Sequence, residues 1–274
     1  MKDTTKRVIA VHDLSGFGRC SFSVIIPTLS ALGVQVCPLP TAVLSTHTGG
    51  YNGFTFRDLT DDLVPYFDHL NTLGSEFHAF YSGFLGSVEQ IEKVAYMIDK
   101  MPDALILVDP VMGDDGELYS TYTSEMREEM KKLVKKADII TPNITEAAFL
   151  LDLAPKSHYE KDEICKIVKG LCAITPAKVV VTGIEGDRCV NCAFSDDAGK
   201  TVSFTTNERV GRQYPGTGDI FASVLLGRML KGECFSDSIA FSSEFVGKVM
   251  AYSARFDYPE REGVLLEAKL SELF

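Results

Sequence analysis

The sequence predicts a three-layer α/β/α sandwich with a mostly parallel central sheet. Short runs rich in β-branched residues alternate along the chain with segments of helical periodicity, which is the order expected of strand–helix–strand units. Most of the strand-like runs are apolar almost throughout, as expected of parallel strands that helices cover on both faces. Because the 274 residues are 45% hydrophobic and show no break in composition, we expect a single domain over residues 1–274.

In the first half of the chain, β-branched and aromatic residues gather in short apolar runs. Strands are therefore expected at 7–11, 34–39, 77–83 and 104–109. Between these runs apolar residues recur every three to four positions, so helices are expected at 22–33, 87–101 and 123–137. The last of these helices mixes acids and lysines at helical spacing, which is typical of a solvated helix face.

The second half of the chain continues the alternation and then departs from it. A strand is expected at 138–143, helices at 145–153 and 163–174, and a further buried strand at 178–183. Two short runs, 189–195 and 201–206, flank a turn-rich segment and predict an antiparallel hairpin. A last helix is expected to begin within PGTGDIFASVLLGRML, residues 215–230.

Composition and charge exclude several classes of protein. The formal net charge is −11 with acids and bases mixed, which argues against a nucleic-acid surface and favours small-molecule chemistry. No apolar run approaches the roughly 20 residues that a membrane span needs, and the N-terminus does not resemble a signal peptide. The seven cysteines are scattered, which fits reduced thiols, so we expect a cytoplasmic protein.

The topology indicates where a site should form. Ligands of open parallel sheets bind beyond the carboxyl ends of the strands, so the polar residues that follow each run are the candidates. These segments are 13–19, 46–51, 82–84, 109–116, 141–146 and 182–186.

The segment YPGTGDIFAS, residues 214–223, places Gly-Thr-Gly-Asp at a helix start. Bare glycines and exposed amides at a helix N-terminus form an anion pocket that the helix dipole reinforces. Asp219 could accept the proton of an alcohol that attacks phosphorus, as the base of a phosphoryl transfer does. A glycine-rich turn whose acid only complements the helix dipole explains the same pattern.

The segment DPVMGDDGELY crowds carboxylates into one short loop after a predicted strand. Asp109 stands at the sheet edge, and Asp114 and Asp115 follow in a glycine-bounded turn. Mg²⁺ shared with nucleotide phosphates would explain the crowding. A turn that simply favours Asp and Gly would also explain it.

Three further segments carry polar residues at the expected edge. Asn143 and Glu146 have the spacing of a capping box, and Glu146 could also face a metal-bound water. After the first strand, Asp13 and Ser15 are polar handles for a substrate. His47 and Thr48 precede two glycines, where His47 is either structural or part of a substrate cover.

Several common motifs are missing from the sequence. It contains neither the P-loop G-x-x-x-x-G-K-[ST] nor the hydrolase elbow G-x-S-x-G. The glycines after the first strand do not have dinucleotide-binding spacing, and the lone C-x-x-C at 189–192 makes a zinc site improbable. A kinase of this sequence must therefore belong to a fold without a P-loop.

Taken together, these segments resemble the ribokinase superfamily, whose late GTGD motif ends in the catalytic aspartate. The closer resemblance is to the pyridoxal and pyridoxamine kinases, through STHTGGY, YSGFLGSVEQ, DPVMGDDGELY, ITPNITEAAFL and PGTGDIFAS in order and spacing. The resemblance covers residues 8 to about 230. It implies a ribokinase-like fold and transfer of the ATP γ-phosphoryl group to the 5′-hydroxymethyl group of a vitamin B6 vitamer.

The resemblance also implies roles for individual residues. The catalytic residues would be Asp219 as the base and Gly216, Thr217 and Gly218 as the anion hole. The acceptor site would be lined by Asp13, Ser15, His47, Thr48 and Phe84. The nucleotide site would contain Thr141, Asn143 and Thr182. The surroundings of Mg²⁺ would be formed by Asp109, Asp114 and Glu146. A monovalent cation is a further candidate cofactor, and family members are commonly homodimers.

Two departures from the family pattern leave alternatives open. HDLSGFGRCS resembles in part the hydroxymethylpyrimidine kinases of thiamine synthesis, in which Asp replaces the serine common in pyridoxal kinases, and Phe84 stands where tyrosine is frequent. A hydroxymethylpyrimidine (phosphomethylpyrimidine) kinase is therefore the alternative enzyme. A non-catalytic vitamer-binding protein on the same fold is the alternative of another class, although an intact GTGD argues against it.

Overall fold

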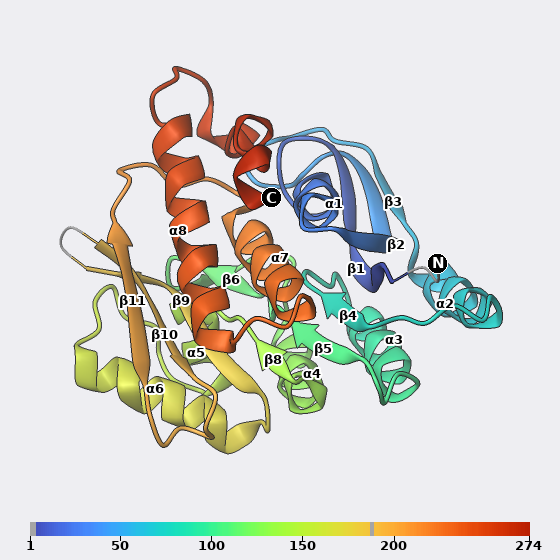
Figure 1. Cartoon of the computed structure of the whole chain (residues 1–274), viewed down its shortest axis with the longest axis horizontal. Helices are drawn as coiled ribbons and strands as arrows, with labels where there is room; N and C mark the ends of the chain where they lie inside the picture. Colours follow the sequence, from blue (N-terminus) through green and yellow to red (C-terminus); the bar gives the residue numbers. More distant parts are fainter. Residues whose placement is uncertain (1–3, 187–188) are drawn as a thin grey trace. The chain divides into compact units, whose positions relative to one another are not determined.

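The structure is a computed structural model that describes residues 4–186 and 189–274. Its contacts divide the chain into two compact units, Met1–Ala79 with Glu208–Phe274 and Phe80–Asn207. Each unit is built from strands and packed helices (Figure 1). The expectation that the chain is a single domain stays a prediction.

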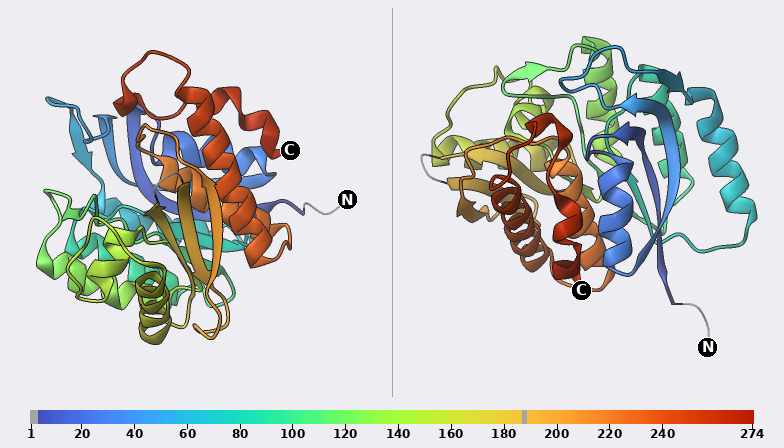
Figure 2. Two further views of the ribbon diagram at one scale, coloured as in Figure 1. Left: turned by 90° about the vertical axis from the view of Figure 1, so that its left-hand side faces the viewer. Right: turned by 90° about the horizontal axis from the view of Figure 1, so that it is seen from above.

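The first unit is built on a long parallel strand pair. Strands β1 (Lys6–Phe17) and β2 (Val34–Thr46) run parallel, with Lys6 opposite Val34 at one end and Phe17 opposite Thr46 at the other. Strand β3 (Phe56–Asp58) runs antiparallel to β2. Residues 8–11 of β1 are fully buried. Helix α1 (Phe22–Ala31) packs against both long strands (Figure 2).

The helices of the first unit come from both ends of the chain. Helix α7 (Thr217–Leu230) packs between α1 and α8 (Phe235–Ser253), and α2 (Leu63–Thr72) packs on β2. Short 3-10 turns lie at Thr60–Asp62 (η1) and, near the C-terminus, at Glu260–Glu262 (η3), Leu266–Ala268 (η4) and Leu270–Leu273 (η5).

In the main sheet, the strands of the second unit follow the order β11-β10-β9-β8-β5-β4. They span Ala79–Ser82 (β4), Leu105–Val108 (β5), Ile139–Ile140 (β8), Lys178–Glu185 (β9), Cys189–Ser195 (β10) and Ser203–Glu208 (β11). The pairs β5–β8 and β8–β9 are parallel, whereas β10 runs antiparallel to β9. The predicted hairpin therefore adds an antiparallel edge to a parallel sheet.

Helices of the second unit pack one against the next in chain order. They are α3 (Val88–Asp99), α4 (Ser124–Leu133, followed by the turn η2, Val134–Lys136), α5 (Ile144–Leu150) and α6 (Lys161–Ile174). Between β5 and α4, a small hairpin forms from β6 (Gly113–Asp114) and β7 (Glu117–Leu118). Valines 179–181 of β9 are fully buried, as expected of a covered parallel strand.

Two predicted strands are longer than the sequence pattern indicated. Strand β1 ends at Phe17 rather than at residue 11, because pairing with β2 resumes beyond a bulge between His12 and Leu14. Asp13 and Ser15 therefore lie within β1 and not in a loop after it. Likewise, β2 continues to Thr46, next to His47.

Helices α2 and α8 and strand β3 are not predicted from the sequence. Helix α8 is rich in serine, which weakens its apolar periodicity. Three of its buried serines donate to main-chain oxygens four residues earlier, Ser238 to Cys234, Ser242 to Ser238 and Ser253 to Val249. Serine therefore packs here without an unpaired hydroxyl.

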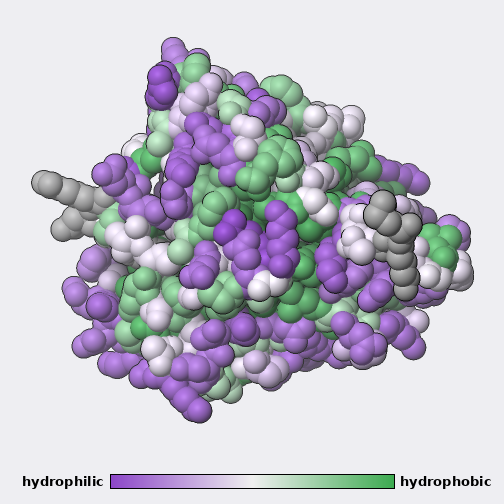
Figure 3. Space-filling view, viewed as in Figure 1, coloured by the Kyte–Doolittle hydropathy of each residue, from purple (hydrophilic) through white to green (hydrophobic). Residues whose placement is uncertain are grey.

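On the face shown in Figure 3, hydrophilic and apolar residues are interspersed in small groups. Among the described helices, none is both long and apolar enough to span a membrane.

Candidate active site

The start of helix α7 depends on a glycine. Gly216 is the N-cap of this helix with φ of 80°, a conformation that favours glycine. A Cβ atom at this position would overlap the main-chain oxygen of Arg19. The glycine therefore lets the helix start close to the segment that follows β1, and it places Asp219 in the first turn of α7.

Asp219 is a largely buried carboxylate whose side chain is 15% exposed. Its Oδ2 atom accepts a hydrogen bond of 2.8 Å from the main-chain amide of Ser21. Burial raises the pKa of Asp219 to about 7, the Ser21 hydrogen bond opposes this rise, and the charge of Asp13 adds to it. A carboxylate that titrates near neutral pH can accept a proton from an alcohol.

His12 lies close to Asp219, with 3.9 Å between its Nδ1 atom and Oδ1 of Asp219. Its side chain is almost fully buried, and burial lowers the pKa of His12 to about 3. His12 is therefore neutral near pH 7 and leaves the charge of Asp219 uncompensated.

Asp13 is held by two serine hydroxyls. Its Oδ2 atom accepts from Ser15 at 2.8 Å, and its Oδ1 atom accepts from Ser21 at 2.6 Å. A carboxylate oriented in this way can still accept a hydrogen bond from a donor on a substrate ring. The expected role of Asp13 and Ser15 in the acceptor site stays a prediction.

His47 is buried, and both of its ring nitrogens contact main-chain groups. The amide of Gly49 donates to Nδ1 at 3.1 Å, so Nε2 carries the proton that it donates to the main-chain oxygen of Arg261 at 2.6 Å. The ring also meets Tyr51 edge-on with 5.0 Å between centroids. His47 therefore fixes the glycine-rich segment after β2, and its neighbour Thr48 is exposed.

The second unit places two buried carboxyl groups near the ends of its strands. Asp109 directly follows β5, and Glu146 lies in the first turn of α5, where it is 3% exposed. Its two oxygens accept from the main-chain amides of Met112 at 3.0 Å and Asn143 at 2.8 Å. Burial, with a further contribution from the charge of Asp109, raises the pKa of Glu146 well above its ordinary value.

Asn143 and Glu146 form the predicted capping box. The Oδ1 atom of Asn143 accepts from the Glu146 amide at 2.8 Å, while the Glu146 side chain accepts from the Asn143 amide. The Nδ2 atom of Asn143 donates to the main-chain oxygen of Gly113 at 2.8 Å. The cap of α5 therefore also holds the β6–β7 hairpin that carries Asp114, whose side chain is exposed.

The remaining predicted residues of the second unit lie in or shortly after its strands. Thr141 follows β8, and its buried hydroxyl has no hydrogen-bond partner within the described part of the chain. Thr182, in β9, forms an isolated parallel bridge with Asn143. Phe84 lies two residues beyond β4 and is half-buried.

The acidic residues do not converge on a ready-made metal site. Within residues 4–186 and 189–274, no group of three or more His, Cys, Asp or Glu side chains is arranged to hold a metal ion. Ligands for a cation around Asp109, Asp114 and Glu146 would have to come in part from a bound nucleotide. Mg²⁺ is usually held in this way, by one or two carboxylates together with phosphates and water.

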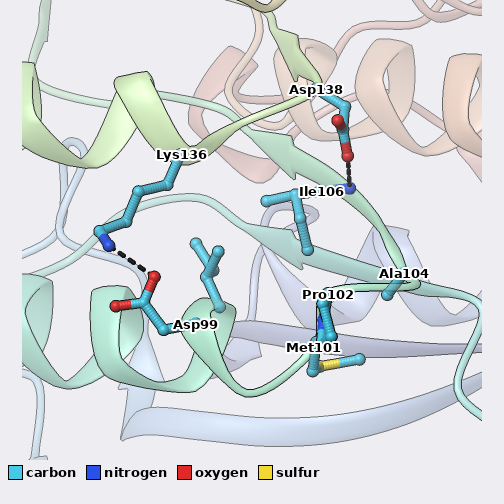
Figure 4. A pocket seen from close by; sticks show the side chains of 8 residues that line it. Asp99, Met101, Pro102, Ala104, Ile106, Lys136 and Asp138 are labelled. Carbon is cyan, nitrogen blue, oxygen red and sulfur yellow. Dashed lines mark hydrogen bonds and ion pairs between the residues drawn. The ribbon is translucent and has the colours of Figure 1, made fainter.

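A shallow depression of about 300 Å³ lies at the amino ends of β5 and β8, whereas Asp109 and Thr141 follow the carboxyl ends of these strands (Figure 4). Its polar side chains are already paired. Lys136 contacts Asp99 at 2.5 Å, and Asp138 accepts from the amide of Ile106 at 2.8 Å. We therefore do not assign it to the active site.

Two residues that orient the predicted ones carry no local signal in the sequence. Ser21 contacts Asp219, and Arg261 contacts His47. Ser21 is separated from Asp219 by 198 positions, and Arg261 from His47 by 214. Only the folded chain brings these pairs together.

A family model described as phosphomethylpyrimidine kinase matches residues 26–262. The chain belongs to this family. Among curated proteins, it is 31% identical over 239 residues to a pyridoxal kinase of Arabidopsis thaliana, covering 81% of this chain and 74% of that one. A pyridoxal kinase of Haemophilus influenzae is 26% identical over 255 residues, covering 87% of this chain and 85% of that one.

Solved structures agree with the curated relatives. A crystal structure assigned as a phosphomethylpyrimidine kinase from Bacteroides thetaiotaomicron is 39% identical with a TM-score of 0.95, covering 100% of this chain and 95% of that one. A second crystal form of that protein, with pyridoxal, is 40% identical with a TM-score of 0.93, covering 98% and 96%. The pyridoxal kinase of Lactobacillus plantarum is 31% identical with a TM-score of 0.91, also covering 98% and 96%.

These comparisons confirm the predicted fold class, a three-layer α/β architecture with a mostly parallel sheet. They also confirm the predicted resemblance to the pyridoxal kinases of the ribokinase superfamily and the prediction of an ATP-using phosphotransferase.

Proposed function

We propose that the protein is an ATP-dependent kinase that phosphorylates the 5′-hydroxymethyl group of a vitamin B6 vitamer, pyridoxal, pyridoxamine or pyridoxine, in the salvage of pyridoxal 5′-phosphate. The observation that carries the proposal is Asp219, a buried carboxylate with a pKa of about 7 in the first turn of α7. Curated relatives named pyridoxal kinase support it.

In the proposed reaction, Asp219 accepts the proton of the hydroxymethyl group. The hydroxyl oxygen of that group attacks the γ-phosphorus, and ADP leaves. The main-chain amides of Gly216, Thr217 and Gly218 would stabilise the charge on the phosphoryl group, because they lie at a helix N-terminus. Asp13 would accept a hydrogen bond from the ring, with Ser15, His47 and Thr48 of the first unit lining the acceptor site. Phe84 is proposed as a further contact of the ring.

For the donor, we propose Thr141, Asn143 and Thr182 as residues of the nucleotide site and Asp109, Asp114 and Glu146 as the surroundings of Mg²⁺. Mg²⁺ would neutralise charge on the phosphates. The oxygen donors suit this ion. Asp109 would be a direct ligand of the ion, and Glu146, whose oxygens are held by the amides of Met112 and Asn143, would face a metal-bound water.

The second candidate is a hydroxymethylpyrimidine kinase. The description of the matching family supports it, as does Asp13, which stands where pyridoxal kinases commonly have serine. Both substrates are flat heteroaromatic alcohols, so the same base and anion hole would serve either one. A non-catalytic vitamer-binding protein is disfavoured, because binding alone does not need a base beside an anion hole.

The experiment that tests the proposal measures ATP consumption by the purified protein with pyridoxal, pyridoxamine, pyridoxine and hydroxymethylpyrimidine as separate acceptors. We expect turnover with at least one B6 vitamer. Turnover with hydroxymethylpyrimidine alone would favour the second candidate, and binding without turnover would favour the non-catalytic alternative.

We further propose a homodimer that works in the cytoplasm, with a monovalent cation as an additional cofactor. The free cysteines support the cytoplasmic assignment, since reduced thiols are typical of that compartment. Sedimentation of the purified protein tests the dimer, and activity in K⁺, Na⁺ and choline salts tests the cation.

A further inference from the structure

Ser21 has an unusual conformation for a residue that begins a helix. It is the N-cap of α1 with φ of 48° and ψ of −134°, a region that non-glycine residues rarely adopt. Serine is a favoured N-cap residue because its hydroxyl usually accepts from an amide of the first turn. The hydroxyl of Ser21 makes no such bond to α1.

Both polar groups of Ser21 contact carboxylates of the candidate active site instead. Its main-chain amide donates to Oδ2 of Asp219 at 2.8 Å, and its hydroxyl donates to Oδ1 of Asp13 at 2.6 Å. One strained residue therefore links the acid proposed to bind the ring with the acid proposed to accept the proton. Its side chain is buried, being 8% exposed, so water competes little for these bonds.

We propose that Ser21 is a positioning residue that sets the substrate-binding carboxylate of Asp13 relative to the base Asp219. The inference rests on the proposed kinase function. The amide fixes Asp219 whatever the side chain, whereas only the hydroxyl orients Asp13. Loss of the hydroxyl should weaken acceptor binding and leave the chemical step largely intact.

The strain at Ser21 makes it possible to separate the effect of a substitution on stability from its effect on acceptor binding. Glycine adopts positive φ freely, so Ser21→Gly should relieve strain and melt at a higher temperature than Ser21→Ala. Both variants lose the hydroxyl and should bind the acceptor equally poorly. Stability and acceptor binding would then change independently at one position.

The test compares Ser21→Ala and Ser21→Gly with Ser30→Ala, an exposed serine of the same helix. We expect KM for pyridoxal to rise roughly tenfold in both Ser21 variants, the scale of a lost hydrogen bond to a charged group, with kcat changed less than about twofold. Ser30→Ala should match the wild type. If Ser21→Ala does not fold, Ser21→Gly gives the same comparison without strain.

Unchanged KM in the Ser21 variants of an active wild-type enzyme would contradict the inference, as would a loss confined to kcat. A wild-type enzyme inactive on every B6 vitamer would instead contradict the proposed function. In that case calorimetric titration of pyridoxal without ATP measures the same loss of affinity, and equal binding by wild type and Ser21→Gly would contradict the inference.

Discussion

The Nε2 atom of His47 lies 2.6 Å from the main-chain oxygen of Arg261. Arg261 belongs to the C-terminal turn η3, and its Nη1 atom also donates to the main-chain oxygen of Gly50 at 3.2 Å. Its guanidinium group lies 4.9 Å from the ring centroid of Tyr51. The C-terminal turn therefore holds the glycine-rich segment proposed to cover the acceptor.

Replacement of Arg261 should loosen this segment. Arg261→Ala keeps the main-chain oxygen that His47 contacts but removes the side-chain contacts with Gly50 and Tyr51. We expect faster amide hydrogen exchange over residues 48–53 and a several-fold rise in KM for the acceptor, with little change in kcat. Arg57→Ala, which removes an exposed arginine of the same unit, is the control. Exchange rates equal to those of the control would contradict this account of the turn.

The pKa of Asp219 gives a pH dependence of activity. The base must be deprotonated, so kcat/KM should fall about tenfold for each pH unit below about 7. Because the vitamers titrate differently from one another, the same midpoint with pyridoxine and pyridoxamine would assign the titration to the protein. Asp219→Ala should lower kcat by roughly 10² or more. Near-normal turnover in this variant would remove Asp219 from the role of base.

The same pKa shift predicts how stability depends on pH. The pKa of Asp219 rises from its ordinary value of 3.8 to about 7, so between these values the folded state keeps a proton that the unfolded chain releases. The stabilisation that the retained proton gives to the folded state is therefore lost as pH rises from about 4 to about 7. Asn cannot ionise, so the stability of Asp219→Asn relative to wild type should increase over that window and level off above it. Urea unfolding at several pH values measures this difference, and a pH-independent difference would contradict the assigned pKa.

The cap of α5 should matter for more than stability. Asn143→Ala removes the cap and the hydrogen bond to Gly113, and we expect a loss of about 1 kcal/mol or more in the free energy of unfolding. Thr123→Ala removes a comparable cap from α4, since the Thr123 side chain accepts from the Met126 amide. Both variants should lose stability, but only Asn143→Ala should also raise KM for ATP. Equal KM values would exclude Asn143 from the nucleotide site.

The requirement for Mg²⁺ should depend on Asp109. Asp109→Asn removes a charge from the proposed ligand, so half-maximal activity should need a several-fold higher Mg²⁺ concentration at fixed ATP. Glu146→Gln should have a smaller effect, because Glu146 is proposed to act on the ion through a bound water and not as a direct ligand. An unchanged Mg²⁺ titration in Asp109→Asn would contradict the cation assignment.

Much of the fold could be predicted from the sequence because its signals are local. Alternating apolar runs and helical periodicity located most strands and helices, and the capping box of Asn143 and Glu146 follows from a three-residue spacing. The start of α7 at Thr217 agrees with the expected effect of its glycines.

The rest depends on contacts between distant residues. The true length of β1 follows from its pairing with β2 beyond a bulge, which no local pattern encodes. The pKa of Asp219 follows mainly from burial and then from the contact with Ser21, which only the packed structure provides. His47 was expected either as a structural residue or in the acceptor site, and its contact with Arg261 gives it a structural partner far along the chain. Its contribution to substrate binding stays a prediction.

The most direct test of the central claim is a competition between acceptors. The wild-type protein receives limiting ATP with equal concentrations of pyridoxal and hydroxymethylpyrimidine, and ³¹P NMR identifies the phosphate monoester that forms. We expect pyridoxal 5′-phosphate as the main product, in an amount equal to the ADP released. Phosphorylated hydroxymethylpyrimidine as the main product would contradict the assignment of the acceptor, and ADP release without either ester would contradict the proposed kinase activity.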